Sequence, residues 1–363
     1  MKKIMIVTNH SYMLYRFRKE LLSRLSNYST IVICTPFVGH EDDFRDCGYT
    51  LIETPINRRG MNPAEDAKLI AQYRSILKEQ APDLVITYSI KPNIYMGSLC
   101  AMYGVPYIAN VQGLGTAFES PKMAAVVSRM YKHGLRKAYK VIFENDGDAQ
   151  VFVERRIVQR KDIEVMQGAG VNLSEYTYHE FPGNDPVHFL FVGRIMKEKG
   201  VGELFDAAER LNQSQNIVLD IIGFYEDEYK ARVEDLVEKG IAVFHGFQEN
   251  PIPYYVASDC VVMPSYHEGM TNVNLEASAL GRPVITTDIP GCNNSVDEGI
   301  TGYLVRPRDT QSLYNAMKHF LTLSIEERAS LGRNARIKME NEFDRNGVVS
   351  RMSYIVSEVL YGA

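Results

Sequence analysis

Short apolar runs alternate with helical patterns along the whole chain. In the first half the apolar runs cover 3–8, 29–35, 83–88, 105–111 and 140–145. A helical pattern begins at about Leu14, between the first two runs. Apolar runs of this length that alternate with helices are typical of a parallel sheet with helices on both faces. We therefore predict a doubly wound α/β domain.

The same alternation begins again after the polar stretch 179–186. The second set of apolar runs covers 187–194, 216–223, 241–246, 259–264 and 282–287. Residues 312–323 and 348–362 follow with apolar positions at helical spacing. We predict an N-terminal domain over 1–183, a C-terminal domain over 184–345, and a final helix over 346–363, for which packing on the N-terminal domain is one arrangement. Two such domains imply a cleft between them, a usual place for a small-molecule site.

Composition supports two globular domains and excludes several classes of protein. The chain has 363 residues, 45% of them hydrophobic, which is too many for one ordinary core. Its five cysteines are scattered and form no C-x-x-C spacing, so neither a disulfide framework nor a zinc site is supported, and a cytoplasmic protein is expected. No apolar stretch reaches the length of a membrane span, and the first residues read as a strand rather than a signal peptide.

Charge is distributed unevenly along the chain. Residues 1–185 carry 23 basic and 20 acidic residues, and the remainder carries 17 and 25, so the halves have net charges of +3 and −8. The first half is expected to face something anionic. Nucleic acid would call for a stronger basic bias and recognisable motifs, so we expect no nucleic-acid partner.

Two glutamates, Glu268 and Glu276, lie eight positions apart with only uncharged residues between them. On one helix they would share a solvated face, and this alternative stays open. The flanking pattern favours a different placement, with Glu268 in a loop after a buried strand and Glu276 on the next helix. In an open parallel sheet, ligands bind at such loops.

Two cations, Arg194 and Lys199, stand in the first strand-to-helix loop of the second half. An Arg fork and a Lys point charge beside a helix start suit a diphosphate. Thr271 and Asn272 open a second helix start that offers backbone N–H groups. A solvated basic turn beside Glu198 is the alternative. Together with the two carboxylates, the set suits a nucleoside diphosphate sugar, because carboxylates accept hydrogen bonds well from sugar diols.

The stretches 193–200, 264–291 and 297–305 (GRIMKEKG, PSYHEGMTNVNLEASALGRPVITTDIPG and DEGITGYLV) resemble the retaining glycosyltransferases of family 4. The resemblance extends over essentially the whole chain and implies the GT-B fold, two Rossmann-like doubly wound domains with a cleft between them. The stretches GLGTAF, KPNIY and TTDIPGC look most like bacterial enzymes that extend lipid-linked oligosaccharides with N-acetylhexosamines or related sugars.

The resemblance also implies roles for individual residues. Arg194 and Lys199 would grip the donor diphosphate, Glu268 would face the donor sugar, and Glu276 would hold the ribose. The loop 244–247 would contact the base. The expected catalytic set is Glu268, Arg194 and Lys199. The expected donor-binding residues are Arg194, Lys199, Gly246, Phe247, Glu268, Gly269, Met270, Thr271, Asn272 and Glu276. The family's mechanism needs no protein nucleophile, and we expect neither a metal nor a cofactor beyond the UDP-sugar substrate.

The chain departs from the family's pattern in its first half. The first strand-to-helix loop, 9–18, lacks the glycine pair that many relatives carry, and Ile90 or Lys91 stands where many have a histidine. The residues that we place on the acceptor side are His10, Arg18, Lys91, Asn93 and Gly113. For Lys91 and Asn93, ordinary loop structure is the alternative. The D-x-D match at Asp146 and Asp148 opens a helix, which favours helix capping over a metal site.

Residues 121–143 carry six basic residues, no acidic one and an apolar stripe at helical spacing. A helix packed on its own sheet with a solvated basic back is one interpretation. Attraction to anionic lipid is the other, and both can hold together.

The function predicted is transfer of a hexose or N-acetylhexosamine, with retention, from a UDP-sugar to an undecaprenyl-diphosphate-type saccharide acceptor in bacterial surface glycan synthesis. The enzyme would be cytoplasmic and peripherally bound to an anionic membrane surface. A non-hydrolysing nucleotide-sugar epimerase and a non-catalytic sugar-nucleotide-binding partner are the alternatives.

Overall fold

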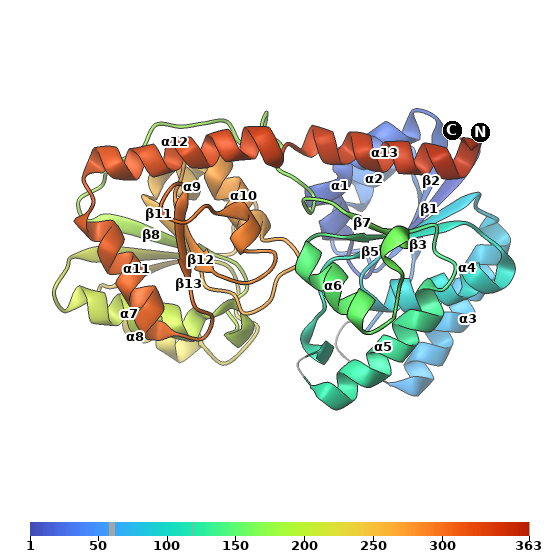
Figure 1. Ribbon diagram of the computed structural model, residues 1–363, viewed down its shortest axis with the longest axis horizontal. Coiled ribbons are helices and arrows are strands. Elements are labelled where there is room, and N and C mark those ends of the chain that lie inside the picture. Colours follow the sequence, from blue (N-terminus) through green and yellow to red (C-terminus); the bar gives the residue numbers. More distant parts are fainter. Residues whose placement is uncertain (58–61, 119, 363) are drawn as a thin grey trace. The chain divides into compact units, whose positions relative to one another are not determined.

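The chain folds into two units, each built on one parallel sheet (Figure 1). The computed structural model describes residues 1–57, 62–118 and 120–362. Unit 1 comprises 1–169 and 347–363, and unit 2 comprises 170–346. The doubly wound α/β class predicted from the sequence is confirmed.

Unit 1 contains a seven-stranded sheet in the order β3-β2-β1-β4-β5-β6-β7. The strands are β1 (Lys2–Val7), β2 (Ser29–Thr35), β3 (Thr50–Glu53), β4 (Leu84–Tyr88), β5 (Tyr107–Val111), β6 (Lys140–Phe143) and β7 (Ile163–Val165). The helices are α1 (Ser11–Ser26), α2 (Glu41–Asp46), α3 (Pro63–Gln80), a π-helical turn (Pro92–Met96), α4 (Gly97–Tyr103), α5 (Pro121–Leu135), α6 (Asp146–Glu154) and α13 (Arg345–Tyr361). The edge strands β3 and β7 are short and were not predicted.

Alternate residues of β1 divide the unit 1 core between the two faces of the sheet. Ile4 and Ile6 pack with residues of α1, α2 and α13. Met5 and Val7 pack with residues of α3 and α4. The helix at the end of the chain therefore belongs to the core of unit 1, on the α1 face.

Unit 2 contains a six-stranded sheet in the order β10-β9-β8-β11-β12-β13. The strands are β8 (Val187–Val192), β9 (Ile217–Ile222), β10 (Ala242–Gly246), β11 (Cys260–Met263), β12 (Val284–Thr287) and β13 (Gly302–Val305). The helices are α7 (Val201–Asn212), α8 (Lys230–Glu238), α9 (Ile252–Ala257), α10 (Asn272–Ala279), α11 (Thr310–Thr322) and α12 (Ile325–Glu342).

The unit boundary differs from the one predicted at 183/184. Residues 170–183 belong to unit 2 because they pair with its end: the Val171 amide donates to Phe343 and the Arg345 amide donates to Val171. Tyr176 is buried in the same cluster as Phe343. A polar stretch with Pro and Gly thus marks a loop inside unit 2, not a domain boundary.

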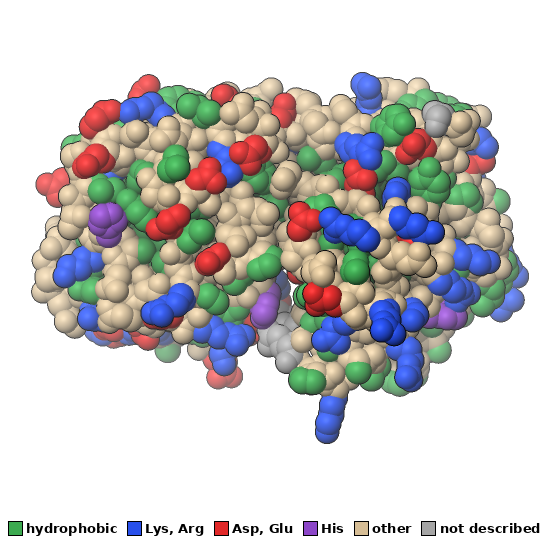
Figure 2. All heavy atoms as spheres, in the orientation of Figure 1, with side chains coloured by type: hydrophobic (Ala, Val, Ile, Leu, Met, Phe, Trp, Pro, Cys, Tyr) green, Lys and Arg blue, Asp and Glu red, His purple; other side chains and the backbone are tan. Residues whose placement is uncertain are grey.

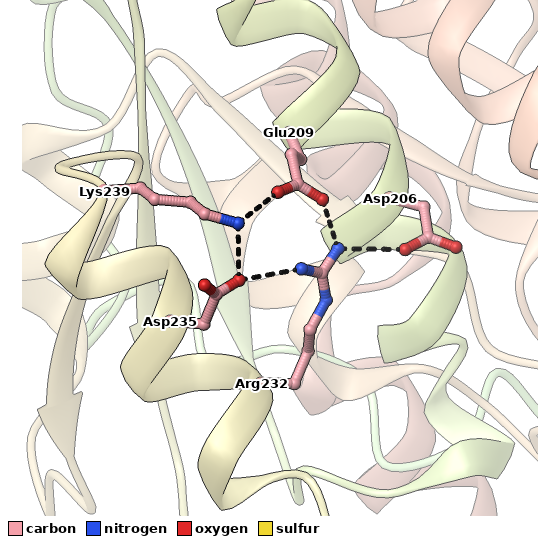
Figure 3. Close-up of polar contacts among 5 residues, drawn as sticks. All are labelled: Asp206, Glu209, Arg232, Asp235 and Lys239. Atoms are coloured by element: carbon pink, nitrogen blue, oxygen red, sulfur yellow. Dashed lines mark hydrogen bonds and ion pairs between the residues drawn. The ribbon is translucent and has the colours of Figure 1, made fainter.

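A charged network joins α7 and α8, the helices that follow the first two strands of unit 2 (Figure 3). Arg232 contacts Glu209 at 2.6 Å and Asp206 at 3.0 Å, and Lys239 contacts Glu209 at 2.6 Å and Asp235 at 2.8 Å. The hydrogen bond from Arg232, with the one from Lys239, lowers the pKa of Glu209 to about 2. The network links α7, which follows the loop of Arg194 and Lys199, to α8, which follows the neighbouring loop.

Candidate active site

The loops after β8 and β11 are neighbours at the centre of the unit 2 sheet. These two strands are hydrogen-bonded, and the strand order runs outward from them in opposite directions. In doubly wound sheets ligands bind at this reversal, outside the carboxyl ends of the strands. Arg194, Lys199 and Glu268 all lie in these two loops.

Arg194 follows β8 and is held by a carboxylate of the next loop along the sheet. Its Nη1 donates to Oε2 of Glu226 at 2.6 Å, and the Arg194 side chain is 40% exposed. The Ile195 amide donates to the Phe224 carbonyl at 2.8 Å, which ties the same two loops through their backbones. A guanidinium carries five N–H donors, so the fork can bind a diphosphate while it keeps Glu226.

Lys199 and Glu268 form an ion pair between Nζ and Oε1. Their side chains are only 18% and 15% exposed. Gly200, at φ +68°, lets the two loops approach, because a Cβ there would lie 2.1 Å from the Pro264 carbonyl oxygen. The Tyr266 amide also donates to the Glu198 carbonyl, at 2.8 Å. The structure thus brings together a cation and a carboxylate that are 69 residues apart in the sequence.

The start of α10 presents polar groups beside Glu268. The Thr271 hydroxyl donates to the Gly291 carbonyl at 3.2 Å and does not cap the helix. In the first turn of α10 the Asn274 amide donates to the Thr271 carbonyl at 3.1 Å, whereas the amides of Asn272 and Val273 have no partner within the helix and could bind an anion. Oδ1 of Asn272 and Oγ of Ser265 are buried and have no hydrogen-bond partner in the part of the chain that the structure describes. Gly291 leaves room for this loop, since a Cβ there would lie 2.4 Å from the Gly269 carbonyl oxygen.

Glu276 lies inside α10 and is only 6% exposed. Its Oε2 accepts a hydrogen bond of 3.0 Å from the hydroxyl of Tyr255 on α9. The alternative in which Glu268 and Glu276 share a solvated helix face is therefore wrong. Glu268 lies within the loop after β11, and Glu276 is buried on the helix that follows.

Two exposed aromatic rings lie at the ends of β9 and β10. Phe224 is 48% exposed and Phe247 57%, with ring centroids 6.3 Å apart at 63°. The Gly223 amide donates to the Gly246 carbonyl at 2.9 Å and joins their loops. His245, which precedes Gly246, contacts Asp220 at 2.7 Å. Phe247 was predicted for the donor site. Phe224, whose ring lies beside that of Phe247, was not named in the prediction, although it also follows its strand through a glycine.

The acceptor-side residues predicted in unit 1 lie at the start of α1, within α1, and in the segments that follow β4 and β5. Ser89 donates to Asn9 Oδ1 at 2.9 Å and joins the two loops, and His10 precedes the first turn of α1. Arg18 is 7% exposed, contacts Glu144 at 3.0 Å and lies over the Tyr88 ring at 5.6 Å.

Asn93 is fully buried, which favours the structural alternative for this residue. Its amide accepts from the Thr87 hydroxyl at 2.6 Å and donates to the Asn110 carbonyl at 2.8 Å, so it joins the ends of β4 and β5. Lys91 is 13% exposed and contacts Asp66 at 2.7 Å. Gly113 lies in the loop after β5 with φ +128°.

Comparison with known proteins identifies the family. One family model, Glycosyl transferase 4-like, matches residues 3–145, and another, Glycosyl transferases group 1, matches residues 186–322. The chain belongs to the GT-B glycosyltransferases. Its fold matches that of Alr3699/HepE from Anabaena, crystallised with UDP and glucose, with a TM-score of 0.80, 16% identity, and coverage of 99% of this chain and 100% of that one.

Two curated relatives of this glycosyltransferase match it along most of their length. The N,N'-diacetylbacillosaminyl-diphospho-undecaprenol alpha-1,3-N-acetylgalactosaminyltransferase of Campylobacter jejuni is 24% identical, with 96% of each chain covered. The UDP-Gal:alpha-D-GlcNAc-diphosphoundecaprenol alpha-1,3-galactosyltransferase of Escherichia coli is 26% identical, with 87% of this chain and 85% of that one covered.

The D-x-D match of the glycosyltransferase lies in the first turn of α6. Asn145, not an aspartate, caps this helix, since its Oδ1 accepts from the Asp148 amide at 2.8 Å. Asp146 contacts Arg160 at 3.2 Å. Asp148 is buried, and burial raises its pKa to about 6. The capping prediction was right about the helix start and wrong about the capping residue.

Proposed function

We propose that the chain transfers a hexose or N-acetylhexosamine, with retention of anomeric configuration, from a UDP-sugar to a saccharide linked to undecaprenyl diphosphate. The product would serve bacterial surface glycan synthesis. The proposal of a UDP-sugar donor rests on one observation: Arg194, Lys199 and Glu268 lie in the two adjoining loops at the β8/β11 reversal. The acceptor half rests on the two relatives, whose names give diphospho-undecaprenol-linked acceptors.

The donor assignment follows from the charges and hydrogen-bonding groups of this site. Arg194, Lys199 and the first-turn amides of α10 suit the diphosphate, and Glu276 suits the ribose hydroxyls. Glu268 would accept from the sugar hydroxyls. Backbone groups of the loop at Gly246 and Phe247 would contact the base.

The mechanism requires little covalent chemistry from the protein. As the bond to the sugar breaks, negative charge develops on the departing diphosphate, and Arg194 and Lys199 would stabilise it. An oxygen of that diphosphate would then take the proton from the acceptor hydroxyl as it attacks the same face of the sugar. The relatives' names specify alpha linkages, and an alpha product from an alpha-linked donor requires retention.

Incubation with UDP-sugars, with and without a diphosphoprenyl-linked saccharide, tests this function. We expect UDP release and an extended saccharide only when both substrates are present, and NMR of the product should report retention. Conversion of the donor sugar without acceptor would instead identify an epimerase. Donor binding without turnover under all acceptor conditions would identify a non-catalytic binding protein.

Metal dependence is tested in the same assay. We propose that Arg194, Lys199 and the helix N-termini neutralise the charge of the diphosphate without a metal ion. Activity should therefore persist in excess chelator. Loss of activity with chelator and rescue by Mn²⁺ would contradict this part of the proposal. It would also make Asp146 and Asp148 candidate metal ligands.

The acceptor class implies work at a membrane surface. Within the described residues, no helix combines the length and apolar character needed to cross a bilayer. We propose that the enzyme associates peripherally with the cytoplasmic face of the membrane through unit 1.

A further inference from the structure

A carboxylate on β9 is shared by two histidines from the neighbouring strands of unit 2. Asp220 lies 2.7 Å from Nδ1 of His188 on β8 and 2.7 Å from Nε2 of His245 on β10. An ionised carboxylate only accepts hydrogen bonds, so each ring donates through the nitrogen that faces Asp220. Asp220 shares its face of the sheet with Ile222, which packs with Tyr255 of α9. The cluster therefore lies on the α9 face.

The cluster differs from the ion pairs on the surface of unit 2. Figure 2 shows acidic and basic side chains interspersed over the side of unit 2 where Figure 1 places α12. The carboxylates that form pairs along this helix are well exposed, 47% for Glu340 and 49% for Glu342. Asp220 is 14% exposed, and charge-assisted hydrogen bonds strengthen as water is excluded. Two such bonds fix the orientation of its carboxylate.

His245 stands at the start of the loop that is proposed to contact the base. It is the extra residue of a β-bulge, because the register with β9 shifts between Phe244 and Gly246. Bulges beside functional sites redirect the chain that follows. The His245 carbonyl also accepts from the Gln248 side chain at 2.7 Å. Asp220 thus restrains the side chain of His245, and Gln248 restrains its backbone.

The short helix α9 contacts both halves of the proposed nucleoside site through two adjacent tyrosines. The centroid of the Tyr254 ring lies 4.7 Å from that of the His245 ring, at 57°. The Tyr255 hydroxyl donates to Oε2 of Glu276 at 3.0 Å. His245 leads into the loop proposed for the base, and Glu276 is proposed for the ribose. One helix therefore contacts the supports of both.

The backbone of α9 is itself restrained at Tyr255. The Tyr255 carbonyl accepts from Nε of Arg282 at 3.1 Å and from the Ser258 hydroxyl at 2.9 Å. Arg282 is fully buried and also donates to the carbonyl oxygens of residues 179, 180 and 281. Although α9 has only six residues, these bonds hold it in place beside α10.

We propose that four residues position the nucleoside contacts of the donor site and act only through their neighbours: Asp220, His245, Tyr254 and Tyr255. His245, oriented by Asp220 and Tyr254, places the loop 246–247 against the base. Tyr255 turns the Glu276 carboxylate toward the ribose hydroxyls. A nucleoside is uncharged, so its recognition depends on polar groups held at fixed positions by their supporting residues. The inference deepens the proposed function and rests on its assignment of the base and the ribose.

Titration with UDP and with inorganic diphosphate tests the base half of the proposal. His245→Ala should weaken UDP binding by about tenfold, close to the loss of one hydrogen bond to a charged group. Its affinity for diphosphate should not change, because Arg194 and Lys199 are untouched. His245→Gln places an amide nitrogen near the former Nε2 position and should restore most of the UDP affinity.

His188 provides a matched control for His245. His188→Ala removes the other hydrogen bond to the same carboxylate, but His188 lies at the amino end of β8, away from the loops that follow the carboxyl ends of the strands. This variant should bind UDP like the wild type. Equal UDP affinities of His188→Ala and His245→Ala would overturn the base half.

Titration with ribose 5-phosphate tests the ribose half. Tyr255→Phe removes one hydroxyl and keeps the buried ring, so unit 2 should stay folded. We expect binding of UDP and of ribose 5-phosphate to weaken by about tenfold, with diphosphate binding unchanged. Tyr314→Phe removes a hydroxyl from α11, on the other face of the sheet, and should change none of the three affinities. Unchanged ribose 5-phosphate binding in Tyr255→Phe would overturn the ribose half.

Steady-state kinetics separate positioning from a contribution to stability alone. The donor KM of His245→Ala and Tyr255→Phe should rise by about tenfold, with kcat near the wild-type value, because no group beside the reacting bond is changed. Equal losses of UDP and diphosphate binding would assign these residues to the stability of unit 2 and overturn the proposal. Wild-type protein that binds UDP but transfers no sugar would contradict the proposed function alone, since the binding comparisons need no transfer. Sugar transfer with UDP affinities that no variant alters would contradict this inference alone.

Discussion

Replacement of Lys199 by methionine removes one charge and keeps most of the side-chain length. Its partner Glu268 is only 15% exposed, so the substitution leaves a poorly hydrated carboxylate without its cation. Two opposite charges 4 Å apart interact by about 4 kcal/mol at an effective dielectric constant of 20. The Glu268 carboxylate then repels the diphosphate that Lys199 is proposed to hold. We expect weaker UDP binding and a roughly 100-fold lower turnover, the size seen when one preorganised contact to developing charge is lost.

A double-mutant cycle separates the two effects. Glu268→Gln alone should depress turnover while UDP still binds, because it removes a sugar contact and releases Lys199 to the diphosphate. The double variant should recover part of the UDP affinity that Lys199→Met loses, with a coupling energy of about 0.5–3 kcal/mol. UDP affinity by calorimetry and turnover by UDP release are the measurements. Lys197→Met removes an exposed lysine two residues away and serves as the control. Near-normal turnover in Lys199→Met, or additive effects on UDP affinity, would refute the reasoning.

Four other predictions concern single residues. Arg194→Ala should lower turnover about 100-fold with the fold intact, and near-wild-type rates would contradict its diphosphate role. Glu276→Ala should raise the donor KM and weaken UDP binding more than Glu268→Gln does, which titration with UDP measures. Phe224→Ala should weaken UDP binding but leave ribose 5-phosphate binding unchanged if the ring stacks on the base, and equal losses for both ligands would exclude stacking. Burial raises the pKa of Asp148 to about 6 from an ordinary value of 3.8, so its protonated form favours the folded state. Stability should therefore fall by about 2 kcal/mol as pH rises from 4 to 7, and less so in Asp148→Asn, as denaturation at each pH will show.

The sequence predicted the central strands of both sheets because their apolar runs are continuous and bounded by polar residues. It missed β3, β7 and β13, which have three or four residues each and lie at or near sheet edges. Periodicity over so few positions cannot separate a strand from a loop. The boundary at 183/184 was misplaced for a related reason. Pairing of Val171 with residues near 344 is a contact between distant parts of the chain, and no local pattern reports it.

The sequence predicted which residues form the candidate site. It did not predict which of these residues form ion pairs with one another or with Glu226. Arg194 meets Glu226 across 32 residues, and Lys199 meets Glu268 across 69. The sequence placed the cations and Glu268 in two separate strand-to-helix loops, and the strand order shows that these loops adjoin. For Asn93 the sequence left substrate contact and ordinary loop structure as alternatives. Its amide joins two strand ends inside the core, which favours the structural alternative.

The pairings also bear on how a donor would enter. Each cation assigned to the diphosphate already has a carboxylate partner from the same unit, which holds the side chain in place without substrate. Donor binding would then be an exchange in which the diphosphate replaces or joins the two carboxylates beside the cations. Repulsion from Glu226 and Glu268 would offset part of the attraction between the diphosphate and the cations. This exchange would lower donor affinity, and it would leave Glu268 beside the sugar if Lys199 turns to the phosphate. The same ion pair would thus hold Lys199 and Glu268 side by side before the donor binds, close to the positions that both are proposed to take during transfer.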